Sequence, residues 1–289
     1  MKPEPRCQSE YDSRQTKAAH RVLIDLAQVL AAFHDCLVLI GGWVPYLLLP
    51  DVQEPHVGSI DVDLALDAEK LHDGRYAGML KILLDTRRYR PGEKPFQLVT
   101  DVELGDGGKP VQVEVEFLAP KEVRLRKNKP KLLEGFRVLR ADACSTAFRA
   151  PVQVVLAGRA IRGAKNKVRL PVASLADFLV MKAHAMEGRD KPKDAYDIVY
   201  CLGNFPEGLE KLAAAWRQRS EEKDVKRAIE ILRDKFTSVE DFGPTQVVEF
   251  LDFPAPDTQA MQARRAFELG KSQTPKNRGL RQPAPSPGT

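Results

Sequence analysis

At 289 residues the chain is long enough for one large domain or two modest ones, and its composition, 43% hydrophobic and 29% charged, is ordinary for a globular protein. No apolar run approaches the roughly 18 residues of a membrane span, and residues 1–15 hold no apolar stretch, so we expect neither membrane contact nor a secretory signal. The four cysteines are far apart and include no CxxC pair. This spacing argues against a zinc site or a disulfide framework and favours the reducing cytoplasm.

The formal net charge is only +5, but the basic residues are unevenly placed. Residues 121–131 hold six basic residues and one acid, and residues 159–169 hold five basic residues and no acid. Either run alone is also what a solvated loop looks like. Two such runs close together favour a polyanionic ligand such as nucleic acid.

The chain divides near residue 170. Residues 1–12 look disordered, and the apolar spacing after Ser13 predicts a helix reaching Phe33, with Ser13 as its cap. Further on we expect strands at 37–40, 60–66, 96–103, 110–118, 136–139 and 152–156, helices at 44–49 and 68–85 with Asp67 as the cap of the second, and basic turns between and after the last strands. Beyond Pro171 the pattern predicts helices at 174–187, 193–202, 207–219, 222–235, 245–251 and 257–270. The predicted fold is therefore a mixed α/β domain at 13–170, a helical domain at 171–270 and a disordered tail at 271–289.

Two carboxylates lie on one face of the strand predicted at 60–66. Asp61 and Asp63 are two residues apart, so in a strand they project from the same side, opposite the apolar Val62 and Leu64. Like charges placed together raise each other's pKa, and a divalent cation removes that conflict. Hard oxygen ligands favour Mg²⁺, with Mn²⁺ as a second candidate. The alternative is an edge strand with a solvated outer face.

Two neighbouring features would complement such a pair. Gly41-Gly42 sits between a strand and a helix start, where free N–H groups favour phosphate, although a plain tight turn also explains it. The strand predicted at 110–118 alternates, with Val111, Val113, Val115 and Phe117 on one face and Gln112, Glu114 and Glu116 on the other. This strand could bring more carboxylates beside the first pair.

The first two predicted helices of the second half carry charges in unusual positions. Lys182 has apolar neighbours at i±3 and i±4, so its ammonium either reaches solvent or meets a buried anion. Asp194 and Asp197 are i,i+3 neighbours near the start of the next helix, where the helix dipole alone stabilises carboxylates. A functional interpretation makes one of the two aspartates a partner of Lys182 or of the acceptor substrate.

In combination, these stretches resemble a known family. Gly41-Gly42-Trp43 followed by Gly58-Ser59-x-Asp61-x-Asp63 is similar to the signature of DNA-polymerase-β-like nucleotidyltransferases. The segments Phe178–Met186 and Arg189–Asp197 resemble the lysine and aspartate motifs of the AbiEii/MenT group, the nucleotidyltransferase toxins of toxin–antitoxin and abortive-infection systems. The four pieces cover residues 38 to 202.

The resemblance implies an enzyme that transfers a nucleotide from an NTP to RNA, most plausibly the 3′ end of a tRNA, and so stops translation; it also implies a possible cognate antitoxin. It implies that Asp61, Asp63 and Glu116 hold Mg²⁺, with Glu114 in reserve, and that Gly41, Gly42, Gly58, Ser59 and Lys182 hold the triphosphate. Asp194 or Asp197 would position Lys182 or the incoming hydroxyl. A nucleotidyltransferase acting on a small molecule such as an antibiotic, and a catalytically silent module that binds RNA or a protein, remain the alternatives.

Overall fold

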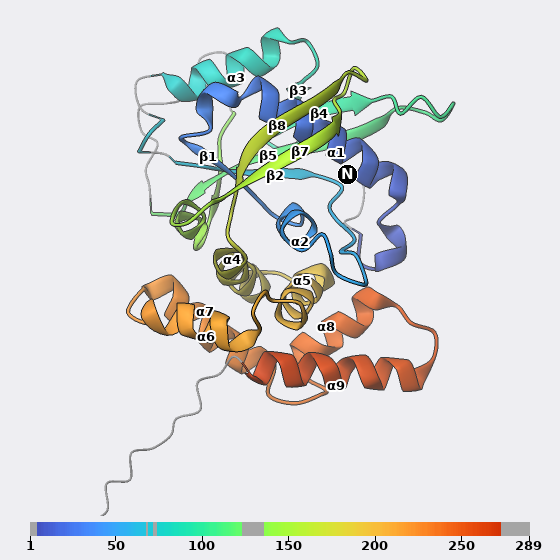
Figure 1. The fold of residues 1–289 in the computed structure, drawn as a ribbon, viewed down its shortest axis with the longest axis vertical. Helices are drawn as coiled ribbons and strands as arrows, with labels where there is room; N and C mark the ends of the chain where they lie inside the picture. The colour runs from blue at the N-terminus through green and yellow to red at the C-terminus, as the bar shows by residue number, and fades with distance from the viewer. Residues whose placement is uncertain (1–4, 68, 72–73, 123–135, 273–289) are drawn as a thin grey trace, which may run out of the picture.

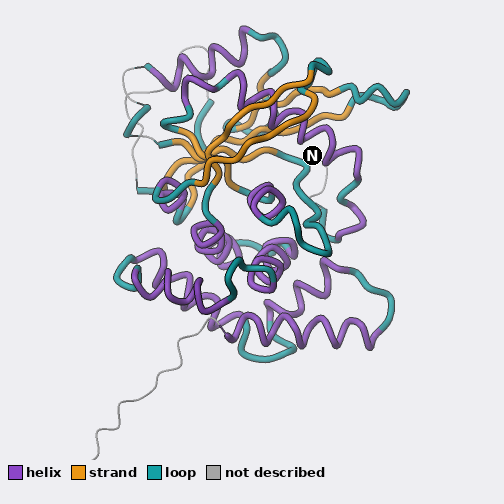
Figure 2. Tube along the Cα trace, in the orientation of Figure 1, coloured by secondary structure: helices purple, strands orange, loops and turns teal. Residues whose placement is uncertain are grey.

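The computed structural model describes residues 5–67, 69–71, 74–122 and 136–272. Strands gather in one half of the molecule and helices α4 to α9 fill the other (Figures 1 and 2). The predicted class, a mixed α/β sheet followed by a helical part, is confirmed. Among the described residues, no helix combines the length and the apolar character needed to cross a bilayer.

The described strands form one mixed sheet in the order β3-β4-β5-β2-β1-β8-β7, and β6 pairs with β5. β2 runs antiparallel to β1 and parallel to β5. The strand bounds are β1 Leu37–Ile40, β2 Val62–Leu66, β3 Arg90–Pro91, β4 Gln97–Val102, β5 Val111–Pro120, β6 Leu139–Ala141, β7 Val152–Arg159 and β8 Lys165–Val172.

Helix α1 packs on β4, β5 and the β7–β8 hairpin, and α2 follows β1 directly. The helix bounds are α1 Ser13–Val29, α2 Trp43–Leu48, α3 Arg75–Asp85, α4 Leu175–Gly188, α5 Pro192–Gly203, α6 Leu209–Gln218, α7 Lys223–Lys235, α8 Phe242–Leu251 and α9 Pro256–Ser272. Short 3-10 helices lie at Gln8–Glu10, Ala31–Phe33 and Cys144–Phe148. The buried apolar core is continuous from α1 and the sheet into α4 and α5, so it does not break at residue 170. The boundary between two domains stays a prediction.

Four local predictions are wrong. Residues 159–169 are not one basic turn, because β7 and β8 form a hairpin whose exposed Lys165, Lys167 and Arg169 alternate with less exposed residues. Charged side chains fit a strand with one solvated face, and this alternation is the signal that the basic composition concealed. The helix expected at 68–85 begins only at Arg75; Asp67 instead accepts from the backbone N–H groups of Glu69 and Lys70 in a turn.

The other two concern the N-terminus. The side chain of Asp12, not Ser13, caps α1 by accepting from the N–H of Arg14 at 2.9 Å. Residues 5–12 are ordered against the helical half rather than disordered: Arg6 pairs with Asp190 and Glu249, and Tyr11 packs edge-on against Phe250. Residues 1–4 and the tail from 273 onward lie outside the described residues, as does most of the basic run at 121–131.

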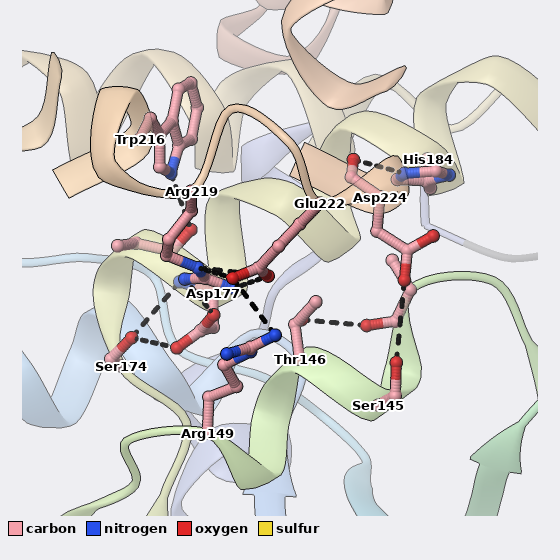
Figure 3. A network of polar contacts seen from close by, with 12 residues as sticks. Ser145, Thr146, Arg149, Ser174, Asp177, His184, Trp216, Arg219, Glu222 and Asp224 are labelled. Carbon is pink, nitrogen blue, oxygen red and sulfur yellow. Dashed lines mark hydrogen bonds and ion pairs between the residues drawn. The ribbon is translucent and has the colours of Figure 1, made fainter. Parts of the chain in front are cut away.

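A polar network joins α4 to the helices that follow it and to the 3-10 helix Cys144–Phe148 (Figure 3). The buried Asp177 carboxylate accepts from Ser174 at 2.6 Å and from Arg219 at 2.7 Å. Glu222 pairs with Arg219 at 3.1 Å and with Arg149 at 3.0 Å. These contacts fix the N-terminal end of α4, the helix that carries Lys182.

Candidate active site

The structure brings together the carboxylates predicted from two strands. Asp63 on β2 lies opposite Glu116 on β5 in the parallel register, so the two side chains share one face of the sheet. Asp61 stands just before β2, where its backbone carbonyl accepts from the indole N–H of Trp43 at 2.7 Å and its carboxylate accepts from Ser59 Oγ at 2.5 Å. We call Asp61, Asp63 and Glu116 the carboxylate edge.

Burial and repulsion between the carboxylates of the carboxylate edge make Asp63 difficult to ionise. Burial, followed by the charges of Asp61 and Glu116, raises the pKa of Asp63 well above its ordinary value. Burial also acts to raise the pKa of Asp61, but Lys191 and the hydrogen bond from Ser59 outweigh it, and the pKa of Asp61 falls below its usual range. One carboxylate is therefore held ionised beside another that is costly to ionise.

Glu116 is already engaged by cationic and amide donors. Its Oε1 lies 2.9 Å from Lys94 Nζ and 3.1 Å from Gln97 Nε2, and the same amide donates to Glu114 at 2.6 Å. Within the described part of the chain, no three side chains of His, Cys, Asp or Glu converge closely enough to hold a metal ion. The roles of Glu116 as third metal ligand and of Glu114 as its substitute stay predictions.

The two glycines after β1 are required by close approach to this edge. Gly41 has φ of +75°, and a β-carbon there would collide with the Asp63 carboxylate. A β-carbon at Gly42 would lie 2.8 Å from Lys193 Nζ and 3.1 Å from Ser59 Oγ. The predicted residues Gly41, Gly42 and Ser59 thus pack closely together beside Asp63. Their binding of a triphosphate stays a prediction.

Lys182 meets buried anions rather than solvent. Its ammonium lies 2.7 Å from Asp194 Oδ1 and 2.8 Å from Asp197 Oδ2, and all three side chains are at most 11% exposed. Arg189 adds a bond of 2.7 Å to Asp194. Burial acts to lower the pKa of Lys182, but the two aspartates outweigh it and raise that pKa above its usual range. Both aspartates contact Lys182, which fits the alternative in which they position the lysine.

Sequence reasoning missed Lys193. It is buried on α5, and its ammonium lies 2.7 Å from Asp197 Oδ1. Burial, reinforced by the charge of Lys182, lowers the pKa of Lys193 despite the attraction of Asp197. Its i,i+4 spacing to Asp197 was the available signal. We call Lys182, Lys193, Asp194 and Asp197 the ion-pair network.

His56 was also missed, because a lone histidine in a loop carries no pattern. Its Nδ1 accepts from the N–H of Gly58 at 3.0 Å, which assigns the proton to Nε2 and lets Nε2 donate to Asp197 Oδ1 at 2.9 Å. Burial, followed by the charge of Lys193, lowers the pKa of His56 to about 4, so the ring is neutral near pH 7. His56 thereby ties the Gly58-Ser59 loop to the ion-pair network.

Comparison with known proteins agrees with these motifs. Residues 24–269 match the family described as "Nucleotidyl transferase AbiEii toxin, Type IV TA system". The chain belongs to the AbiEii family. Among solved structures it is similar to the antibiotic-resistance factor ANT(2'')-Ia, known from a solution structure, with 18% identity and a TM-score of 0.32 over 72% of this chain and 94% of that chain. No curated protein matches.

Membership of the AbiEii family makes the chain a nucleotidyltransferase toxin of a type IV toxin–antitoxin system, with an NTP as substrate and a cognate antitoxin as the implied partner. The donor set at the carboxylate edge suits a hard divalent cation, since Mg²⁺ commonly takes one or two protein carboxylates plus substrate phosphate oxygens. The raised pKa of Asp63 marks the position where added positive charge is favourable. Asp61 and Asp63 fit such an ion, whereas Glu116 would first have to leave Lys94.

Proposed function

We propose that this AbiEii toxin transfers a nucleotide from an NTP to RNA, at the 3′ end of a tRNA, and thereby blocks translation in the cytoplasm. The observation that carries the proposal is the charge conflict at Asp63 directly beside the Gly41–Gly42 turn. An anionic triphosphate and its Mg²⁺ or Mn²⁺ satisfy both features at once, because the cation neutralises the carboxylates and the glycines admit the phosphates.

In this proposal Asp61 and Asp63 hold the cation, which neutralises negative charge on the reacting phosphate. Gly41, Gly42 and Ser59 surround the triphosphate, and Gly58 lets the loop carrying Ser59 turn with φ of +77°. The ammonium of Lys193 lies close to Gly42. Lys182 contacts Asp197, the carboxylate that also binds Lys193, and so acts on the triphosphate indirectly. Asp194 and Asp197 are positioning residues, because their oxygens contact Lys182.

An RNA acceptor is supported by the exposed face of the β7–β8 hairpin. Arg159 pairs across the hairpin with Lys165, and Lys167 and Arg169 continue the same face because alternate residues of a strand share a side. Across the described residues, none of these four side chains has a carboxylate partner. Uncompensated cations on a strand face suit a phosphate backbone.

The decisive experiment incubates the purified protein with each α-labelled NTP in turn, total RNA and Mg²⁺, and separates the RNA on a gel. We expect label in the tRNA band with at least one NTP. Asp61→Asn should abolish labelling while RNA binding persists, and Asp101→Asn, an exposed carboxylate of β4 paired with Arg90, is the matched control. Absence of label with every NTP contradicts the proposal. Toxicity that survives Asp61→Asn supports the silent binding module instead.

A further inference from the structure

A cavity of about 690 Å³ opens beside the active site. Its walls come from the N-terminal segment, the first turns of α1, helix α2, the loop before Gly58, the β4–β5 turn and the end of β7. The lining residues that matter here are Tyr11, Arg14, Lys17, Arg21, Tyr46 and Arg159. The volume lies within the range of about 300–1,000 Å³ typical of ligand pockets.

The cavity wall is cationic. Arg14 is neutralised by Asp106, with its Nε 2.7 Å from the carboxylate. Among the described residues, Arg21 bonds only to the backbone carbonyls of Glu103 and Leu104, and Arg159 only to that of Gly163. Over the part of the chain that the structure describes, Lys17 has no ion-pair partner. Three positive charges therefore remain uncompensated, which favours an anionic ligand and disfavours a cationic small molecule.

Two tyrosines supply flat surfaces between these charges. Tyr46 is 37% exposed and is held edge-on against Trp43, with ring centroids 5.2 Å apart. Tyr11, of the same lining, packs against Phe250. Aromatic rings and cations in one lining are the combination that binds single-stranded nucleic acid, because bases stack on the rings while phosphates meet positive charge.

The cavity lining contacts residues of the candidate active site. The ring of Tyr11 lies 5.5 Å from Lys193 Nζ, the ammonium beside Gly42. On the other wall, a β-carbon at Gly58 would lie 2.9 Å from Thr16 and 3.4 Å from Tyr46. Gly58 is three residues from Asp61, a stretch that spans at most about 11 Å. The cavity wall therefore lies within about 11 Å of chain from the carboxylate edge.

We infer that this cavity binds the single-stranded end of the RNA acceptor, stacking a base on Tyr46 and holding phosphates with Lys17, Arg21 and Arg159. The inference rests on the proposed function, because the bound end must reach the NTP. Arg159 belongs both to the cavity and to the basic face of the β7–β8 hairpin, so the remaining RNA can continue along Lys165 and Lys167. The N-terminal segment, through Tyr11, completes the wall.

The test measures binding of a short, fluorescently labelled single-stranded RNA by anisotropy at several salt concentrations. Tyr46→Leu should weaken binding by about 5- to 100-fold at every salt concentration, the effect of losing one stacked base. Lys17→Gln should also weaken binding and should lower the slope of log K against log salt by about 0.7, the value for one phosphate contact on a single strand. Lys81→Gln, an exposed lysine of α3, is the matched control and should change neither quantity.

The outcomes separate this inference from the proposed function. If the parent protein labels RNA and both cavity variants bind RNA as the parent does, the acceptor lies elsewhere and only the cavity inference falls. If the parent neither labels nor binds RNA, the proposed function fails and the cavity inference fails with it. If the variants keep RNA affinity but escape neutralisation by the antitoxin, the cavity accepts an acidic partner protein and the inference is overturned. Weaker RNA binding with unchanged NTP affinity supports it.

Discussion

The carboxylate edge and the ion-pair network lie side by side but arrange charge in opposite ways. At the edge, Asp61 and Asp63 face each other and the pKa of Asp63 rises. In the network every ammonium meets a carboxylate, and the pKa of Asp197 falls well below its usual value because Lys182 and Lys193 outweigh its burial. Completed charge pairs stabilise the fold, whereas an uncompleted pair is available to a ligand. The difference separates charges that are already paired within the protein from charges that a ligand would complete, although the same residue types build both.

Removing one member of the ion-pair network should produce the largest loss of stability. Lys182→Met removes the ammonium that Asp194 and Asp197 share, which should cost about 3 kcal/mol of the free energy of unfolding. This is the lower end of the range for breaking a buried pair, because Asp194 keeps Arg189 and Asp197 keeps Lys193. Urea denaturation at pH 7 measures this quantity. Lys81→Met, which removes only an exposed pair with Asp85, should change it by less than about 1 kcal/mol. Equal effects of the two substitutions would show that the network is not a stabilising scaffold.

The network should also make stability depend on acidity through His56. Its pKa is about 4 in the folded protein and about 6.5 in the unfolded chain, so between these values the unfolded state binds more protons. Stability should therefore fall as the pH falls from 6.5 to 4, by about 3 kcal/mol from this residue. Denaturation of the parent and of His56→Gln across this window measures the difference, and the variant should lose less. His20 and His34, whose pKa values burial also lowers, act in both proteins and cancel.

The sequence predicted the parts of the site that depend on local pattern. Alternation along a strand predicted that Asp61 and Asp63 share one face. It also predicted that Glu114 and Glu116 share one face of a strand that could lie beside them. The structure pairs Asp63 with Glu116. The apolar surroundings of Lys182 correctly indicated either solvent or a buried anion, and the structure selects the anion. Helices α4 to α9 begin and end within a few residues of their predicted bounds, because their apolar faces repeat at helical spacing.

What the sequence could not supply depends on contacts between distant segments. No sequence pattern near His56 indicates its hydrogen bond with Asp197, which is 141 positions away. Likewise, the polar composition around Tyr11 indicates disorder until α8 supplies Phe250 as a packing surface. The sequence did not predict the hairpin at Lys165 for a different reason. Its strand has one solvated face and so has the polar composition of a loop.

A substitution in the carboxylate edge should change the free energy of unfolding in the opposite direction to a substitution in the ion-pair network, and by a smaller amount. The raised pKa of Asp63 means that this buried carboxyl costs stability at pH 7; the cost shrinks as the pH falls through the folded pKa and is gone only near the ordinary pKa of an aspartate, about 4. Asp63→Asn should therefore raise the free energy of unfolding at pH 7, and this gain should shrink to nothing as the pH falls towards about 4. Asp101→Asn, at an exposed ion pair, should give no gain at either pH.

Added Mg²⁺ should raise the melting temperature of the parent but not of Asp63→Asn, since only the parent keeps both carboxylates. Nucleotide transfer by the stabilised variant should nevertheless fall by about 100-fold or more, because the carboxylate that destabilises the empty site is the one that the bound cation requires. A variant that is less stable than the parent at pH 7 would show that Asp63 belongs to the scaffold and not to the site.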